Sequence, residues 1–227
     1  MTIESHSFPN TFLVTQSSDD KRLVTKNAVP GVSVYKERLF SIAGTEYREW
    51  NPYRSKLSSA ILKGLEVPFF CGKILYLGAA SGTTCSHISD ILSLCGSGIL
   101  YAVEFSLRVA RDLVQLADSR GNIVPILADA RDPRQYSSFV GQVDIIFQDL
   151  AQPDQADILL RNAKLFLRQN GIILLAIKAR SVDATVSPKE IFSGEIQRLK
   201  PDFMIKQEIR LDPFQKDHMM VLGVLRD

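Results

Sequence analysis

Cysteine is scarce in this sequence of 227 residues, and the three cysteines, at positions 71, 85 and 95, form no C-x-x-C pair. An odd number without such a pair argues against a disulfide framework or a zinc finger, and predicts buried or incidental thiols in a reducing compartment. No stretch approaches the roughly 20 apolar residues of a membrane helix, and the first residues lack the basic start and apolar core of a secretory signal. We therefore expect a cytoplasmic protein without a membrane anchor.

Neither sign of charge dominates the chain. It has 27 Lys and Arg residues against 25 Asp and Glu residues, which gives a formal net charge of +2. Such a weak overall field does not hold a polyanion on its own. If the protein acts on nucleic acid, we expect a partner to deliver the substrate.

Residues 1–52 are predicted to form a small β-rich domain. Short β-prone pieces at 11–15, 22–25, 32–35 and 38–42 are separated by turn formers, among them Pro30-Gly31 and Ala43-Gly44. This pattern indicates a small antiparallel meander.

Residues 53–227 have a different rhythm. A helical pattern over 55–63 ends at Gly64, and apolar runs at 73–77, 98–103, 123–127, 143–147 and 171–177 then alternate with amphipathic segments such as 107–117 and 155–167. Continuous apolar runs are typical of strands that are buried on both faces. The alternation predicts an α/β fold with a Rossmann-like parallel sheet and right-handed crossovers.

Each apolar run is followed by glycine or polar residues. The first runs into the small-residue turn 78–84, and the next four end in Glu104, Asp129, Asp149 and Lys178. Ligands of open parallel sheets bind at the carboxyl ends of the strands. One such residue alone is more often a tight turn or a helix cap, but five at equivalent positions favour a binding site.

The spacing of these residues distinguishes between cofactors. The turn has the pattern G-x-x-x-G from Gly78 to Gly82, whereas a dehydrogenase fingerprint has G-x-G-x-x-G facing a pyrophosphate. Glu104 follows about 20 residues later, where a carboxylate binds ribose hydroxyls. Asp129 could accept from an adenine amino group. This combination suits S-adenosylmethionine, which has adenine and ribose but no phosphates.

Lys178 and Asp149 end neighbouring predicted strands, so an ammonium and a carboxylate are expected to meet at the edge of the cofactor, unless they form a plain ion pair. Methylation of a ribose hydroxyl needs an oriented oxygen and removal of its proton. A neutral lysine could be the base, or a charged one could stabilise the alkoxide. Lys56, in the first turn of a helix, and His218, at the start of the last strand, are further candidates. His6 and His87 are predicted to be structural or exposed, and no metal site is predicted.

Seven segments resemble the fibrillarin family, the methyltransferases of box C/D guide ribonucleoproteins. They are LVTKNAVPG (23–31), EYREWNPYRSKL (46–57), YLGAASGTT (76–84), EFS (104–106), LADAR (127–131), DLAQP (149–153) and IKARS (177–181). They occur in family order and extend the resemblance from about residue 12 to the C-terminus. The resemblance implies an S-adenosylmethionine-dependent methyltransferase fold with a seven-stranded, mostly parallel sheet and a small β-rich N-terminal domain.

The resemblance also implies roles for particular residues. Thr83 and Thr84 would contact the amino-acid portion of the cofactor, Glu104 its ribose, and Phe105, Asp129 and Ala130 its adenine. The stretch Asp149, Leu150, Ala151 and Gln152 would contact the methionine end, and Gly78 and Ala80 belong to the same binding set. Lys56, Asp149, Lys178 and His218 resemble the K-D-K-H set that positions and activates the 2′-hydroxyl.

Members of this family act inside a particle. The resemblance implies a Nop-domain scaffold protein, a kink-turn-binding protein and a box C/D guide RNA as partners, with rRNA and tRNA as substrates. The sequence has no Gly/Arg-rich N-terminal tail, which favours the archaeal type. It departs from the family pattern at Leu107, where proline is usual, and at Asp132, where histidine is frequent. The second departure could alter the rim of the pocket.

Three alternatives stay open at this level. A stand-alone ribose methyltransferase of the heat-shock FtsJ type also uses a lysine, aspartate and lysine set, and would act without a scaffold. A particle subunit could keep the fold without the chemistry, although the intact K-D-K-H set argues against it. A nicotinamide dehydrogenase is a distant third.

Overall fold

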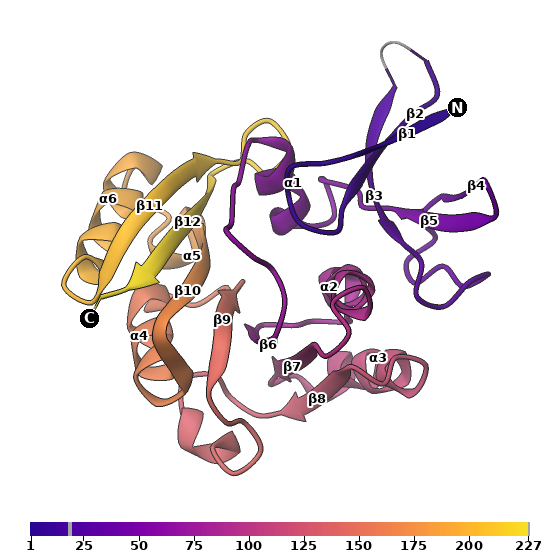
Figure 1. The fold of residues 1–227 in the computed structure, drawn as a ribbon. Helices are drawn as coiled ribbons and strands as arrows, with labels where there is room; N and C mark the ends of the chain where they lie inside the picture. Colours follow the sequence, from indigo (N-terminus) through magenta and orange to yellow (C-terminus); the bar gives the residue numbers. More distant parts are fainter. Residues whose placement is uncertain (18–19, 227) are drawn as a thin grey trace.

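The computed structural model describes residues 1–17 and 20–226, which form two sheets and the helices around them (Figure 1). The first sheet is antiparallel, with the strand order β1-β2-β3-β5-β4. Its strands are β1 (Thr2–Ser5), β2 (Phe12–Thr15), β3 (Lys21–Lys26), β4 (Leu39–Ile42) and β5 (Thr45–Glu49). Val14, Val24 and Phe40 form a small core on one of its faces. The β-rich N-terminal region predicted from the sequence is confirmed.

The strand predicted at 32–35 is wrong, because this segment forms turns and bends. The Glu37 carboxylate accepts hydrogen bonds from the backbone N–H groups of Val34 and Tyr35, at 3.0 and 2.8 Å. These bonds take up donors that a strand would offer to a neighbour, so the β-prone side chains are held in a turn instead. The strands β1 and β5 were not predicted; in β5 three of the five residues are charged, and Glu is depleted in strands.

The second sheet has the order β11-β12-β10-β9-β6-β7-β8. Its strands are β6 (Lys73–Leu77), β7 (Ile99–Glu104), β8 (Ile123–Leu127), β9 (Val143–Gln148), β10 (Leu167–Lys178), β11 (Phe203–Arg210) and β12 (His218–Leu225). Neighbouring strands from β8 to β10 pair in parallel, and β12 is antiparallel to both β10 and β11. The predicted seven-stranded, mostly parallel sheet is therefore confirmed. Because β6 lies between β9 and β7 and pairs in parallel with both, the carboxyl ends of these three strands come together at one edge.

Helices cover both faces of this sheet (Figure 1). On one face, Ile74 and Tyr76 pack in a cluster with residues of α1 (Lys56–Leu62), α2 (Thr83–Ser93) and α3 (Leu107–Asp118). On the other, Leu75 and Leu77 pack with residues of α4 (Gln155–Phe166) and α6 (Pro188–Leu199). Successive strand residues alternate between faces, so both faces need apolar side chains, which explains the continuous apolar runs. Two short helices, η1 (Pro133–Tyr136) and α5 (Ala179–Val182), complete the fold.

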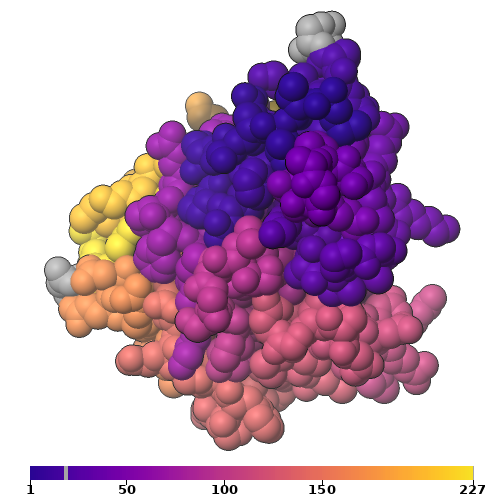
Figure 2. All heavy atoms as spheres, turned by 45° about the vertical axis from the view of Figure 1, so that its right-hand side comes forward, coloured from indigo at the N-terminus to yellow at the C-terminus, as the bar shows by residue number. Residues whose placement is uncertain are grey.

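The N-terminal sheet shares its core with the larger sheet. Phe8, Leu23 and Trp50 are fully or almost fully buried in the same apolar cluster as α1 and α2. In Figure 2 the indigo and violet atoms of the N-terminal region lie directly on the pink atoms of the larger region. The predicted boundary between residues 52 and 53 falls in the loop between β5 and α1. Trp50 and Leu57, on either side of this boundary, both belong to the shared cluster.

A buried polar network reinforces this contact. The Arg48 guanidinium, which is inaccessible to solvent, donates to Glu37 at 2.6 Å, to Asp90 at 2.9 Å and to Ser86 at 2.9 Å. Asp90 also accepts from Arg120 at 2.6 Å. Each charge is thus paired, as burial requires. The network connects β5 to α2, the helix that begins at Thr83.

His87 lies in the same interface. Its ring stacks on Trp50 with centroids 4.9 Å apart, and its nitrogens lie 2.8 Å from the hydroxyl oxygens of Thr25 and Tyr35. Burial, together with Arg48 and Arg120, holds the pKa of His87 well below its usual range. His87 is therefore a neutral residue that joins the two regions.

The prediction for the cysteines was wrong in part. Cys71 and Cys95 form a disulfide with their Cα atoms 5.9 Å apart, whereas Cys85 is a buried thiol whose pKa is raised by burial. The loop before β6 and the end of α2 become neighbours only through the fold, so sequence spacing alone did not reveal the pair. Cysteine usage therefore no longer supports a reducing compartment. Within residues 1–17 and 20–226, every helix is too short or too polar to span a lipid bilayer.

Candidate active site

The turn after β6 brings two strand ends into close contact. Gly78 has a φ of +85°, and a Cβ atom at this position would lie 2.5 Å from the carbonyl oxygen of Asp149. A side chain there would push the two strand ends apart. Gly82, with a φ of +94°, is the N-cap of α2. The two glycines of the predicted motif are therefore required by backbone conformation and by packing.

Glu104 fixes the conformation of this turn. Its carboxylate accepts from the backbone N–H of Ala80 at 3.0 Å and from that of Ser106 at 2.8 Å. A carboxylate has about four lone-pair sites, so roughly two stay free for hydroxyl groups of a ligand. The position of Glu104 is thus set by the backbone, and its remaining acceptors suit the two hydroxyls of a ribose.

A first cavity, of about 280 Å³, lies beside Glu104. Asp129 is on its wall and forms an ion pair with Arg131, with Nε 2.9 Å from Oδ2. The hydrogen bonds from Arg131 lower the pKa of Asp129, so Asp129 carries a negative charge near neutral pH. The cavity is lined by Gly78, Ala80, Glu104, Phe105, Ala128, Asp129, Ala130, Arg131, Asp149, Leu150, Ala151 and Gln152.

A second cavity, of about 330 Å³, adjoins the first. The two share Gly78, Ala80, Asp149 and Ala151 as wall residues. The second cavity is lined by Arg54, Lys56, Tyr76, Gly78, Ala79, Ala80, Thr83, Thr84, Asp149, Ala151 and Lys178. Together the two cavities contain every residue predicted to bind the cofactor. An elongated ligand with a nucleoside at one end and an amino acid at the other suits this pair of adjoining cavities.

Asp149 is paired with a different lysine from the one expected. Lys56 Nζ lies 2.8 Å from Oδ1 of Asp149, and this pair is largely shielded from solvent. Lys178 lines the same cavity, but among the described residues its side chain has no ion pair. The hydroxyl oxygen of Ser55, the N-cap of α1, lies 3.0 Å from the hydroxyl oxygen of Thr84 in α2. This contact places the start of α1 against α2. This packing brings Lys56 over the end of β9.

Lys178 and His218 lie opposite each other on β10 and β12. The backbone of Lys178 is held by Gln155, whose side chain accepts from its N–H at 2.9 Å and donates to its carbonyl at 3.1 Å. Gln155 was not predicted, because its site lies on a helix far from Lys178 in sequence. Both backbone groups of Lys178 are thereby held by one side chain.

His218 has a defined tautomer. Its Nδ1 lies 2.6 Å from the carbonyl oxygen of Lys216, and a carbonyl only accepts, so Nδ1 carries the proton. Burial lowers the pKa of His218, and the charges of Lys56 and Lys178 lower it further. His218 is therefore largely neutral near pH 7, with a free lone pair on Nε2.

Five wall residues were missed by the sequence reasoning: Ala79 and Ala128, which were quoted only within motifs, and three larger side chains. Tyr76 was assigned to an apolar strand and quoted within a motif, and Arg131 was quoted only as part of a motif, but neither was given a role in the site. Arg54 was also quoted only within its motif, although a second cation two residues before Lys56 was a usable signal. The departures at Leu107 and Asp132 lie outside the walls of both cavities, at the start of α3 and at the N-cap of η1.

The family model of fibrillarin matches residues 3–227 of this chain. The chain belongs to the fibrillarin family. A fibrillarin-like rRNA/tRNA 2′-O-methyltransferase of Sulfurisphaera tokodaii is 52% identical over 224 residues, which cover 97% of this chain and 95% of the relative. These matches confirm the resemblance to fibrillarin predicted from the seven segments.

Solved fibrillarin structures have the same fold. The Aeropyrum pernix fibrillarin, in complex with natively bound S-adenosyl-L-methionine, has a TM-score of 0.90 and 48% identity, and the match covers 99% of this chain and 98% of that one. The fibrillarin of a fibrillarin/Nop5p complex has a TM-score of 0.88 and 41% identity, and the match covers 98% of this chain and 100% of that one. The methyltransferase fold class predicted from the sequence is therefore confirmed.

Proposed function

We infer that this fibrillarin is the S-adenosylmethionine-dependent methyltransferase that modifies ribose 2′-hydroxyls of rRNA and tRNA within a guide-RNA particle. The observation that carries this conclusion is the position of Asp149, which lies on the walls of both cavities and holds Lys56 at 2.8 Å. The same residue thus connects the cavity that suits a nucleoside to the cavity with the lysines. Family membership supports the same activity, because the named relative is a 2′-O-methyltransferase.

S-adenosylmethionine, when bound, supplies an electrophilic methyl group on a sulfonium. The chain must aim a ribose oxygen at that methyl group and take its proton. Lys56 is engaged by Asp149, which keeps its ammonium in a fixed position. Within the part of the chain that the structure describes, Lys178 has no competing carboxylate, and it would stabilise the developing negative charge on the oxygen. His218 would accept the proton on Nε2, the one nitrogen of its ring that carries a free lone pair.

The scaffold partner is supported by a relative. A fibrillarin that matches this chain over 98% of its length has been solved in a complex with Nop5p, so a Nop-domain protein is the partner proposed here. The kink-turn-binding protein and the box C/D guide RNA belong to the same proposal. The net charge of +2 supports dependence on such partners, since a weakly charged chain gains little affinity for RNA from its overall field.

Reconstitution tests this function. The chain is combined with the scaffold, the kink-turn protein, a matched guide and an RNA that carries either a 2′-hydroxyl or a 2′-deoxy position at the target. Methyl transfer from labelled S-adenosylmethionine is expected only with the 2′-hydroxyl RNA and the complete particle. Full activity of the isolated chain would favour the stand-alone FtsJ type instead, and cofactor binding without transfer would favour a non-catalytic subunit.

A further inference from the structure

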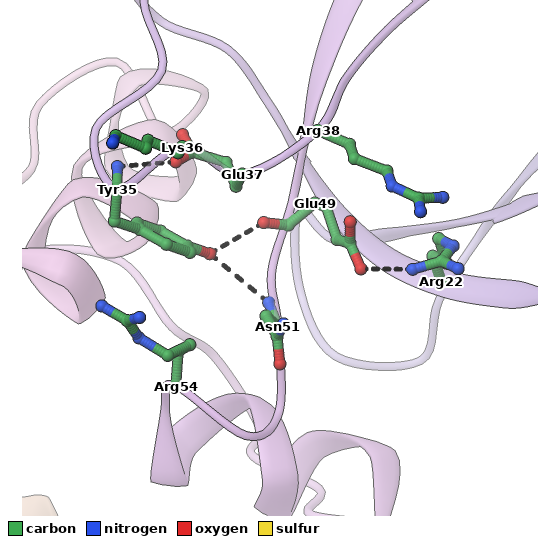
Figure 3. Close-up of a pocket in the computed structure, with 8 residues that line it drawn as sticks. All are labelled: Arg22, Tyr35, Lys36, Glu37, Arg38, Glu49, Asn51 and Arg54. Carbon is green, nitrogen blue, oxygen red and sulfur yellow. Dashed lines mark hydrogen bonds and ion pairs between the residues drawn. The ribbon is translucent and has the colours of Figure 1, made fainter.

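A third cavity, of about 360 Å³, lies in the N-terminal region (Figure 3). Four cationic and two carboxylate side chains are among its wall residues, which are Arg22, Tyr35, Lys36, Glu37, Arg38, Glu49, Asn51 and Arg54. None of them belongs to the predicted cofactor or catalytic sets. The cavity therefore offers a cationic surface that the methyl-transfer reaction itself does not explain.

Both carboxylates already have partners. Glu37 accepts from the buried Arg48 at 2.6 Å, and Glu49 accepts from Arg22 at 2.6 Å. By contrast, Lys36, Arg38 and Arg54 have no carboxylate partner among residues 1–17 and 20–226. All three are exposed. The cavity thus has an excess of free positive charge, which suits an anionic ligand.

The cavity is also built from fixed parts. The hydroxyl of Tyr35 donates to the carbonyl of Glu49 at 2.8 Å, and the Arg54 guanidinium lies over its ring, 5.8 Å from the centroid. Lys36 has a φ of +64° in the turn that the Glu37 carboxylate closes. This turn holds the backbone of Lys36 between two anchored neighbours. The Arg54 guanidinium and the backbone of Lys36 are therefore positioned in advance, which reduces the entropy lost when a ligand binds.

Arg54 connects this cavity to the catalytic one. It lines both the third cavity and the second cavity, where Lys56, Asp149 and Lys178 lie. Arg54, Lys36 and Arg38 therefore continue the cationic surface from the reacting groups onto the N-terminal region. A ligand that extends from the second cavity past Arg54 reaches the third cavity next.

We propose that the third cavity binds backbone phosphates of the RNA strand that carries the target nucleotide. This inference rests on the proposed function, because the strand must enter the second cavity to present its 2′-hydroxyl. A polynucleotide has phosphates at every nucleotide, so one that passes Arg54 brings further anions to Lys36 and Arg38. Phosphate contacts fix the register of a strand without reading its bases, as is needed where a guide RNA selects the sequence. An acidic segment of the scaffold protein is the competing ligand.

The double variant Lys36→Gln/Arg38→Gln tests the proposal in the complete particle. It leaves Arg54 and the second cavity intact, and Lys189→Gln/Lys206→Gln, on exposed positions of α6 and β11, is the matched control for the loss of two charges. The apparent Kd for substrate RNA should rise roughly 5- to 30-fold in the first variant and change little in the control. The slope of log Kd against log salt should fall by about 1.4 for a single strand. Turnover at saturating RNA and affinity for S-adenosylmethionine should stay at wild-type values.

A scan with neutral methylphosphonates locates the contact. Single phosphates on either side of the target are replaced, and binding is measured with a 2′-deoxy target so that no transfer is needed. At one or two flanking positions the replacement should weaken binding to the wild-type particle but not to Lys36→Gln/Arg38→Gln. This binding measurement does not depend on methyl transfer, so it is independent of the proposed function. Failure of the proposed function would instead appear as a wild-type particle that binds the 2′-hydroxyl RNA without methylating it.

Two outcomes overturn the proposal. The double variant could bind RNA with the affinity and salt slope of the control, which would leave the cavity without an RNA role. Alternatively, calorimetry could show weaker binding of the variant to the scaffold protein with an unchanged RNA salt slope, which would assign the cavity to a protein partner.

Discussion

Replacement of Arg48 by methionine tests the network between the two regions. The Arg48 side chain is inaccessible to solvent and donates to Glu37, Asp90 and Ser86. Removal of one partner from a buried ion pair costs about 3–5 kcal/mol, because a charge stays buried without compensation. Asp90 keeps Arg120 at 2.6 Å and Glu37 keeps its two backbone donors, so we expect the lower end of this range, about 3 kcal/mol.

The measurement is urea unfolding followed by circular dichroism, with thermal unfolding alongside. For a domain of this size, about 3 kcal/mol corresponds to a decrease in Tm of roughly 6–12 °C. Arg134→Met is the control, because Arg134 is 86% exposed and its ion pair with Asp132 contributes at most about 1 kcal/mol. A loss of stability in Arg48→Met no larger than in Arg134→Met would refute the argument. A weaker affinity for S-adenosylmethionine is also expected, since Ser86 lies in the first turn of α2.

The other predictions concern pH, the disulfide and the catalytic set. Because the folded pKa of His87 lies well below 6.5, the unfolded chain binds an extra proton below that pH, so stability is lost on acidification from about pH 6.5, by up to about 1.4 kcal/mol per pH unit. His87→Gln should reduce this slope in pH-dependent unfolding, and an unchanged slope would contradict the assignment. Cys95→Ser should lower the free energy of unfolding by about 3.5 kcal/mol under oxidising conditions, because the disulfide closes a loop of 24 residues, and should have little effect in reductant. Asp149→Asn should lower methyl transfer in the particle by about 10²-fold or more, because Lys56 loses its charged partner; activity near that of wild type would exclude the pair from the mechanism.

Much of the site was predictable because it depends on local pattern. Apolar runs identified the parallel strands, and the rule that ligands bind at their carboxyl ends was enough to select Glu104, Asp129, Asp149 and Lys178. The glycines at 78 and 82 were also visible in the sequence, and both have a positive φ, which glycine adopts without steric cost. The resemblance to fibrillarin then supplied roles that spacing alone does not provide.

Contacts between distant elements were decided by the tertiary structure. The partner of Asp149 is Lys56 rather than Lys178, because α1 packs against α2 and brings its first residue over the end of β9. Cys71 meets Cys95, and Arg54 lies between two cavities, for the same kind of reason. Periodicity and motifs describe what each segment can form, whereas ion pairs, disulfides and cavity walls depend on how segments far apart in the chain are packed together.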